Sequence, residues 1–298
     1  MRRHVAAALV LTALAFGSLP AAAQLTENLG ALSQENAKKY LGPLPDAFSG
    51  TMNSAIFTSG KVPKTGINFS IGLKVMGINF DSGDRLFTPT DPPGFSSVAP
   101  VQQAPTVIGS TSAVTQNGQG GATLYYPGGF DITEFAFAAP QASIGSLMGT
   151  RAVVRWFSHN FGAHDLLTKV NYFGVGAQHS ITQYFTTLPV DIAVGAFYQE
   201  FKANDHLMDI KTTHADVTVS KSFPILQPYG AIGFDIFNMD ASYEDSTNPG
   251  NTIAVSFDQT SHIHMTAGVA ANLAFVALHA EANFAATNGV AVGLSVGY

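Results

Sequence analysis

Apolar and polar residues alternate with a period of two along most of the chain, most clearly near its end. One face of residues 290–298 carries valine, leucine and a final tyrosine, and the other carries alanine, glycine and serine. The same alternation recurs over 67–75, 152–156, 188–199, 210–220, 226–236, 253–273 and, in the opposite phase, 274–284. Side chains of a β-strand point alternately to opposite faces, so each run predicts a strand with one apolar face.

The second face of these strands carries small and uncharged polar residues, where a soluble sheet would expose charges. Charged residues make up 11% of the 298 residues, against roughly 25% in soluble domains. Strands of this kind are typical of a transmembrane barrel, with lipid outside and a polar lumen inside. We therefore predict an all-β fold, an antiparallel transmembrane β-barrel of about ten strands, with twelve as the alternative count. A soluble β-sandwich is the alternative class.

The chain divides into three predicted parts. Residues 1–23 combine Arg2 and Arg3 with an apolar run and three alanines, which predicts a bacterial secretory signal peptide. Residues 24–64 are expected to form a short helical segment, in which Ser33 is suited to cap a helix. Residues 65–298 form the predicted barrel.

The segment 24–64 is expected to plug the lumen. The alternatives are that it lies against the periplasmic mouth or binds a periplasmic partner. As a plug it would line a path for apolar solutes with its apolar side chains, which are Leu41, Leu44, Phe48, Met52, Ile56 and Phe57.

Charged and polar side chains opposite the lipid faces are the candidate lumen residues. They are Arg151, Arg155, Asp191, Asp216, Asp235, His262, His264, His279, Glu281 and Asn283. We expect the arginines to pair with the aspartates, since such pairs satisfy charge inside a small barrel. A charge-lined solute path is the alternative.

The turn near residue 274 is expected to bring His264 close to Asn283, and Thr266 close to Glu281. Such a cluster could bind a divalent metal or supply the acid and base of an embedded hydrolase. We expect hydrogen-bonded lumen residues instead, with no metal, no cofactor and no catalytic residue.

Aromatic residues near strand ends predict the girdles that anchor a barrel at the two membrane interfaces. They are Trp156, Tyr184, Phe185, Tyr198, Phe201, Phe223 and Phe237. Short turns are expected near 186–189, 222–225 and 273–275, and longer loops near 158–165, 203–208 and 243–251. Tyr298 is the predicted signal for the outer-membrane assembly machinery.

Composition and motifs exclude several other classes of protein. With 14 Lys+Arg against 20 Asp+Glu, a net charge of −6 and no basic cluster, no nucleic-acid partner is expected. The absence of cysteine excludes a disulfide framework, a thiolate metal site and a lipoprotein anchor. The HExxH, GxSxG, P-loop and dinucleotide motifs are absent, so we do not expect an enzyme.

Five short motifs carry a resemblance to a known family. They are Asn36 to Pro43 (NAKKYLGP), Pro127 to Gly129 (PGG), Phe173 to Ile181 (FGVGAQHSI), Val219 to Ser222 (VSKS) and Pro228 to Gly230 (PYG). The chain resembles a family of secreted bacterial proteins of unknown function that are predicted to be outer-membrane barrels. Its layout is also similar to that of fatty-acid-type transporters of hydrophobic compounds, an analogy of architecture without a shared motif.

Taken together, these patterns predict an outer-membrane barrel that acts as a passive channel or transporter for small molecules, apolar ones among them. A non-conducting structural or interaction barrel is the alternative, because about ten strands enclose little space once side chains fill it. A barrel enzyme is the less favoured alternative. The expected partners are the lipid bilayer, the assembly machinery and a small-molecule solute.

Overall fold

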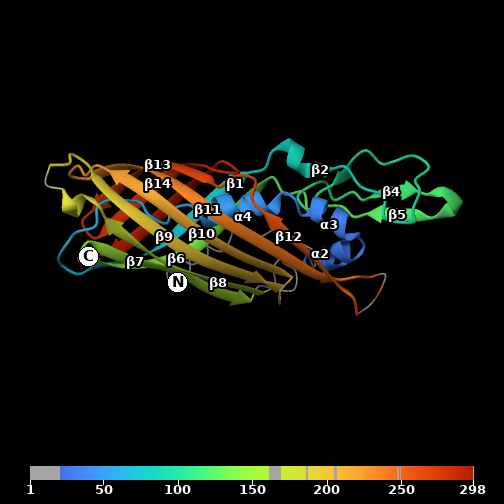
Figure 1. The fold of residues 1–298 in the computed structure, drawn as a ribbon, viewed down its shortest axis with the longest axis horizontal. Helices are drawn as coiled ribbons and strands as arrows, with labels where there is room; N and C mark the ends of the chain where they lie inside the picture. Colours follow the sequence, from blue (N-terminus) through green and yellow to red (C-terminus); the bar gives the residue numbers. More distant parts are fainter. Residues whose placement is uncertain are drawn as a thin grey trace, which may run out of the picture.

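The computed structural model describes residues 21–160, 169–185, 187–204, 207–246, 248 and 250–297. Its main body is a closed barrel of ten antiparallel strands (Figure 1), which confirms the predicted fold class. The strands are β1 (Asn68–Asn79), β6 (Glu134–Leu147), β7 (Thr150–Asn160), β8 (Lys169–Ser180), β9 (Asp191–Ala203), β10 (Met208–Ser220), β11 (Leu226–Glu244), β13 (Ile263–Leu273), β14 (Val276–Phe284) and β15 (Gly289–Gly297). They pair in this order around the ring, and β15 closes it on β1.

Two predicted features fall largely outside the described residues. Only the last three residues of the predicted signal peptide, 1–23, are described, and they begin helix α2 (Ala21–Gly30). Tyr298 is not among the described residues. In the described part of the chain, no helix is both long enough and apolar enough to span a membrane.

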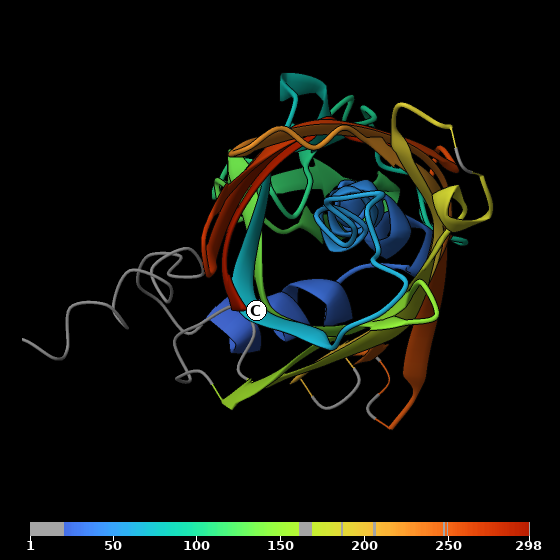
Figure 2. The same cartoon turned by 90° about the vertical axis from the view of Figure 1, so that its left-hand side faces the viewer.

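Three helices precede the barrel strands, and the third lies inside the ring. Helix α3 (Gln34–Tyr40) begins after Ser33, whose side chain accepts the backbone N–H of Asn36 at 3.4 Å, as the capping prediction requires. Helix α4 (Leu44–Met52) enters the barrel, and the chain after it continues through the ring to β1 (Figure 2).

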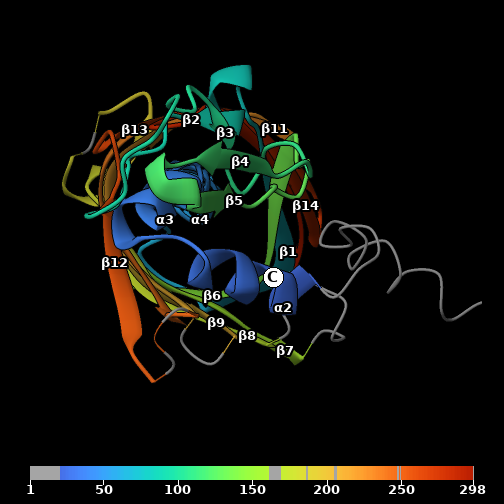
Figure 3. The ribbon, with the colours of Figure 1, turned by 90° about the vertical axis from the view of Figure 1, so that its right-hand side faces the viewer.

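The two ends of the barrel differ. One end carries the connections 148–149, 181–190, 221–225 and 274–275, and we name it the short-turn end. The other, the long-loop end, carries α2, α3 and the connection between β1 and β6, with its small strands (Figure 3). These elements are η2 (Ser82–Arg85), β2 (Leu86–Phe87), β3 (Ala104–Pro105), β4 (Val114–Asn117), η3 (Gln119–Gly121) and β5 (Thr123–Tyr126).

The expected alternation of short and long connections is followed only in part. The turns 221–225 and 274–275 are short, as predicted. At the same end, however, residues 181–190 form a longer connection that includes η4 (Thr182–Tyr184). At the long-loop end, β9 and β10 are joined only by residues 204–207.

Strand β11 shows that the barrel wall has two halves with opposite polarity. Near the short-turn end its outward side chains are apolar, with Ile232 64% exposed, and inward Asp235 is 1% exposed. Toward the long-loop end the outward residues are polar, such as Asn238, while inward Met239 is fully buried. At 19 residues the strand is also about twice the length that a tilted strand needs to cross a bilayer. The polarity therefore inverts part-way along the wall.

Strand β12 (Thr252–Asp258) pairs with the half of β11 near the long-loop end. Between β12 and β13 the alternation of inward and outward residues changes phase. In β12 the odd-numbered Val255 and Phe257 are buried, whereas in β13 the odd-numbered Ile263 and Met265 are exposed. Residues 259–262 interrupt the ladder between these two strands. The sequence-based assignment of 253–273 to a single face is therefore wrong, because the inner face of β12 covers α3 and not the polar lumen.

Candidate functional site

Arg155 binds the end of helix α4 in the middle of the lumen. Its guanidinium is fully buried and donates hydrogen bonds to the carbonyl oxygens of Met52 at 3.0 Å and Ser54 at 2.9 Å. Its Nε donates to Gln141 Oε1 at 2.8 Å. The last carbonyls of a helix lack partners within the helix and carry partial negative charge, so a cation there stabilises the helix end. Arg155 thus fixes α4 to the barrel wall.

The residues just after α4 are bound from other sides of the barrel. The side chain of Asn53 contacts Thr212 on β10 and Gln199 on β9, with both distances at 3.0 Å. On the opposite wall, Glu281 Oε1 accepts the backbone N–H of Ala55 at 2.7 Å. Ala55 has a φ of 57°, a left-handed conformation that costs a residue with a β-carbon free energy. The wall contacts stabilise this turn in the chain.

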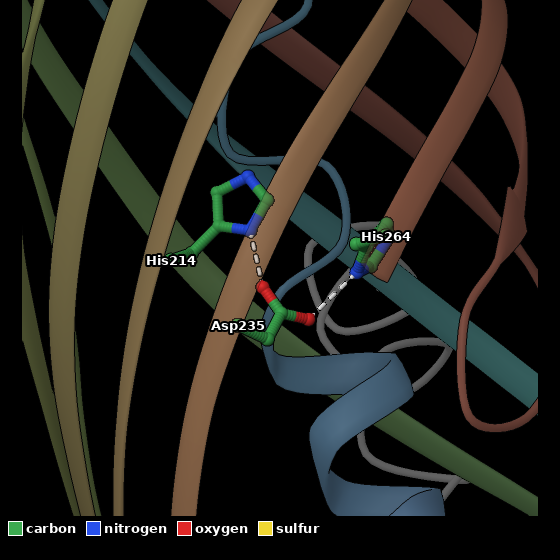
Figure 4. Close-up of side chains that lie close together, drawn as sticks. All are labelled: His214, Asp235 and His264. Carbon is green, nitrogen blue, oxygen red and sulfur yellow. Dashed lines mark hydrogen bonds and ion pairs between the residues drawn. The ribbon is translucent and has the colours of Figure 1, made fainter. Parts of the chain in front are cut away.

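Two histidines on neighbouring strands contact the carboxylate of Asp235 (Figure 4). Asp235 Oδ1 lies 2.6 Å from His214 Nδ1, and Oδ2 lies 3.0 Å from His264 Nδ1. His214 and Asp235 are direct partners in the ladder between β10 and β11. His264, on β13, lies opposite Gly233 of β11. All three side chains are buried. The cluster therefore joins three consecutive strands from the inside.

The hydrogen bonds continue from His264 to residues 44–62, which lie inside the barrel and are called the inner segment. His264 Nε2 lies 3.0 Å from Asn283 Oδ1, and Asn283 Nδ2 donates to Glu281 Oε1 at 2.9 Å. The amide nitrogen must face the carboxylate, so its oxygen faces His264. Both ring nitrogens of His264 therefore lie against oxygen atoms, of Asp235 on one side and of Asn283 on the other.

Glycines on the inner face leave room for these side chains. A β-carbon at Gly233 would lie 2.6 Å from Cε1 of His214. One at Gly268 would lie 2.4 Å from Cζ of Tyr229, whose hydroxyl donates to Glu281 Oε2 at 2.6 Å. A larger residue at either position would displace a ring that the network uses.

The long-loop half of the lumen is filled by an apolar core. Phe48 of α4 packs on Phe135 and Phe201, with ring centroids 4.8 Å and 5.2 Å apart. The six apolar residues expected to line a solute path are all buried in such contacts or beside Phe197. In this conformation they close the lumen, and a path for apolar solutes along them stays a prediction.

Near the long-loop end the same segment is fixed by polar contacts. The hydroxyl of Tyr40 donates to the carbonyl of Gly128 at 3.0 Å, which joins two of the motifs noted in the sequence. Burial raises the pKa of Tyr40, so its hydroxyl remains a hydrogen-bond donor at neutral pH.

The structure places most of the candidate lumen residues on the inner face of the wall. The buried ones are Arg155, Asp216, Asp235, His264, His279, Glu281 and Asn283, and the half-buried ones are Arg151 and Asp191. His262 is an exception, because its exposed ring stacks on outward-facing Phe234 at 5.2 Å. The prediction of a lumen position for His262 is wrong, because residues 259–262 interrupt the strand.

The expected pairing of arginines with aspartates is also wrong. Arg151 donates to the carbonyl oxygens of Ser59 and Lys61, and Arg155 to those of Met52 and Ser54. The backbone of the inner segment offers these acceptors, and sequence patterns do not show where that backbone lies.

The remaining carboxylates contact other groups. Asp216 accepts from Thr218 at 2.7 Å, and Asp191 from Ser222 at 3.5 Å. The expected contact of His264 with Asn283 is present, but Thr266 pairs with Asn283 and not with Glu281.

His214 is the functional residue that sequence reasoning missed. It falls on the polar, inward face of 210–220 together with Asp216, and this position was the available signal. Of the predicted girdle residues, Trp156, Tyr184, Phe185, Tyr198 and Phe223 are exposed. Phe201 and Phe237 are only 2% exposed and belong to the apolar core, so their assignment to the girdle is wrong.

His214, Asp235 and His264 could also offer ligand atoms to a metal, since these atoms lie within 4.8 Å of one another. A metal would need a deprotonated ring nitrogen of each histidine turned toward it. Here both Nδ1 atoms contact the carboxylate.

The fold and its interior define a class: a closed, ten-stranded antiparallel β-barrel with its own N-terminal segment bound inside the lumen. The chain belongs to a family of unknown function, DUF6588, whose sequence model matches residues 1–298. The comparison with curated proteins finds no match.

Among solved structures, the chain is similar to a mutant Rh. blastica porin, at 13% identity over 78% of this chain and 100% of the porin, with a TM-score of 0.17. It is also similar to Salmonella typhi OmpF in complex with daunomycin, at 11% identity over 79% and 98%, with a TM-score of 0.19.

Proposed function

We propose that the protein is an outer-membrane barrel that transports small molecules, in which residues 44–62 close the lumen and must shift for a solute to pass. The observation that supports this most strongly is how the inner segment is bound. Between residues 52 and 60 it donates hydrogen bonds to Thr212, Glu281 and Ser220 and accepts two from Arg155, beside the apolar contacts of Ile56 and Phe57. Water can replace such bonds at modest cost, whereas an apolar core of the same size resists opening.

Two further observations support the proposed membrane location. The outward side chains of the short-turn half form an apolar belt, as at Ile71, Val217, Ile232 and Val292. A closed barrel has no edge strand that lipid would leave unpaired. In this proposal the long-loop half projects beyond the bilayer, and its outward polar residues face water.

A specific observation favours a second candidate function, a barrel that does not conduct. The apolar contacts of Phe48 with Phe135 and Phe201 seal the long-loop half. A barrel of this kind would serve as a stable platform for its loops, and the inner segment would never leave.

A disulfide lock tests transport against the sealed alternative. The chain has no cysteine, so Asn53→Cys with Thr212→Cys introduces a single pair at a contact of 3.0 Å between the inner segment and the wall. We expect channel openings in planar bilayers from the wild type and from the reduced variant. Oxidation should abolish the openings, and reductant should restore them.

The matched control joins two strands of the wall and leaves the inner segment free. Asn238→Cys with Asp258→Cys bridges β11 and β12 at a side-chain contact of 3.0 Å, and its oxidation should leave conductance unchanged. If the wild type shows no openings, the sealed barrel is the better assignment. If the oxidised Asn53/Thr212 variant still conducts, the inner segment is not the gate.

The membrane location gives a separate prediction on the outer surface of β11. Ile232→Arg places a charge in the middle of the apolar belt, where a bilayer should make it cost on the order of 2–4 kcal/mol of folding free energy. Asn238→Arg, on the same face six residues on and likewise exposed, should change stability by less than about 0.5 kcal/mol. Urea titration of folding into lipid vesicles measures both, and equal, small effects would contradict a lipid-facing belt.

A further inference from the structure

The short-turn end of the lumen contains a cavity of about 460 Å³ beneath the inner segment. Residues of the inner segment form one side of it, and the ends of β1, β6, β7, β13, β14 and β15 form the others. The charged or ionisable side chains that line it are Lys61, Lys74, Arg151 and His279, and its described lining includes no aspartate or glutamate. Volumes of 300–1,000 Å³ are typical of small-molecule sites.

Lys74 and His279 leave a hydrogen-bond donor without a partner. Lys74 is 5% exposed, and its Nζ lies 3.1 Å from His279 Nδ1. An ammonium group can only donate, so Nδ1 accepts and the ring carries its proton on Nε2. That Nε2 is buried and has no partner among the described residues, and His279 as a whole is 7% exposed. This buried N–H belongs to a side chain that lines the cavity, and nothing in the described chain satisfies it.

A glycine in the barrel wall leaves room for Lys74 and His279. A β-carbon at Gly293 would lie 2.0 Å from Cε1 of His279 and 2.7 Å from Cδ of Lys74. Glycine at this position on β15 allows the imidazole and the lysine stem to lie flat against the strand. Both side chains are thus held in place before any ligand binds.

Arg151 contributes a second incompletely used cation. Its Nη2 donates to the carbonyl oxygens of Lys61 at 3.0 Å and Ser59 at 3.5 Å. Its Nε is buried and has no partner among the described residues. Buried donors without acceptors cost free energy, and a ligand that accepts from them would remove that cost.

Nearby carboxylates form their hydrogen bonds with other groups. Glu281, one layer further into the barrel, already accepts from Ala55, Tyr229 and Asn283. Asp191 contacts Ser222 and does not line the cavity. Among the described residues, no carboxylate forms an ion pair with the cations at the cavity.

We propose that this cavity binds a small oxyanion, with Lys74, Arg151 and His279 donating to its oxygens. Charge-assisted hydrogen bonds of this kind are among the stronger polar contacts in proteins. The apolar side chains of Phe57 and Val153 also line the cavity and would cover the body of an organic acid. The site goes beyond the proposed function, because binding here needs no opening of the lumen.

Equilibrium dialysis of the refolded full-length barrel in detergent, with radiolabelled inorganic phosphate at fixed ionic strength, tests the proposal. We expect saturable binding to the wild type and to Lys211→Met, which removes an exposed cation from the outer wall. Lys74→Met and Arg151→Met should each bind about 10- to 100-fold more weakly. The mobility of unboiled protein on SDS gels confirms that each variant is folded.

A second arm with labelled benzoate distinguishes an inorganic ligand from an organic one. Tighter binding of benzoate would assign the site to an organic carboxylate, and tighter binding of phosphate would assign it to an inorganic oxyanion. If neither probe binds, or if folded Lys74→Met binds both as tightly as Lys211→Met does, the proposal is wrong. Because dialysis measures binding alone, failure of the transport proposal would leave its result unaffected.

Discussion

Replacing Arg155 with alanine is expected to release the inner segment from the barrel while the strands remain assembled. The guanidinium is fully buried and donates to Met52, Ser54 and Gln141. Its loss leaves buried acceptors without donors and creates a cavity, at a cost on the order of 3–5 kcal/mol. That cost falls on the docking of α4, because two of the three bonds join the wall to the last residue of α4 and to Ser54, two residues further on.

Hydrogen–deuterium exchange measures this release directly. In the Arg155→Ala variant, exchange of residues 44–62 should become faster by about 100-fold or more, while exchange in β13 to β15 should stay unchanged. Conductance in planar bilayers should rise in parallel, if the segment is the gate. Arg155→Lys retains the charge but not the planar guanidinium with its several donors. We therefore expect an intermediate increase in the exchange of residues 44–62.

Arg85→Ala is the matched control for the loss of an arginine. Arg85 lies at the long-loop end, where it donates to Ile132 and forms a partly exposed ion pair with Asp131. Such pairs contribute about 0–1 kcal/mol, so exchange of 44–62 should match the wild type. Unchanged exchange in Arg155→Ala would show that other contacts hold the segment.

Periodicity predicted the barrel because it is a local property of each strand. Lipid on one side and polar side chains on the other impose a period of two, as in 290–297, and that pattern survives without knowledge of strand order. The helix that begins after Ser33 was predictable for a similar reason, since the cap contact spans three residues.

Periodicity could not show where the wall changes polarity. Along β11 the alternation continues without a break from Ile232 to Met239, but the apolar residues move from the outside to the inside. A period of two shows that the two faces of a strand differ in polarity. It does not show which of the two faces contacts water. The same ambiguity placed Phe237 in the girdle and assigned 253–259 to the wrong face.

The contacts of the site depend on strand register and on the path of the inner segment through the barrel. Neither can be read from a single sequence. His214 meets Asp235 because β10 and β11 pair in one particular register. His264 joins them only because β13, and not β12, pairs with that part of β11. Arg155 binds carbonyls of a segment about 100 residues earlier, and backbone acceptors have no residue signature.

The second large effect is expected at Asp235, which is 1% exposed and accepts from both His214 and His264. Asp235→Ala leaves His214 and His264 buried without the acceptor they share, with their ring centroids 5.5 Å apart. A buried donor left without its acceptor costs about 1–3 kcal/mol, and here two donors lose theirs at once. Urea titration of the gel-mobility shift should show this loss as destabilisation of the whole barrel.

Two variants separate this cause from a general loss of packing. Asp240→Ala, on the same strand, removes an exposed carboxylate that accepts from Ser256 at 2.6 Å, and it should cost less than about 1 kcal/mol. Adding His264→Gln to Asp235→Ala removes one of the two rings left without an acceptor, so the double variant should be more stable than Asp235→Ala alone. If the second substitution only adds to the loss, the cluster stabilises the barrel by packing and not by its hydrogen bonds.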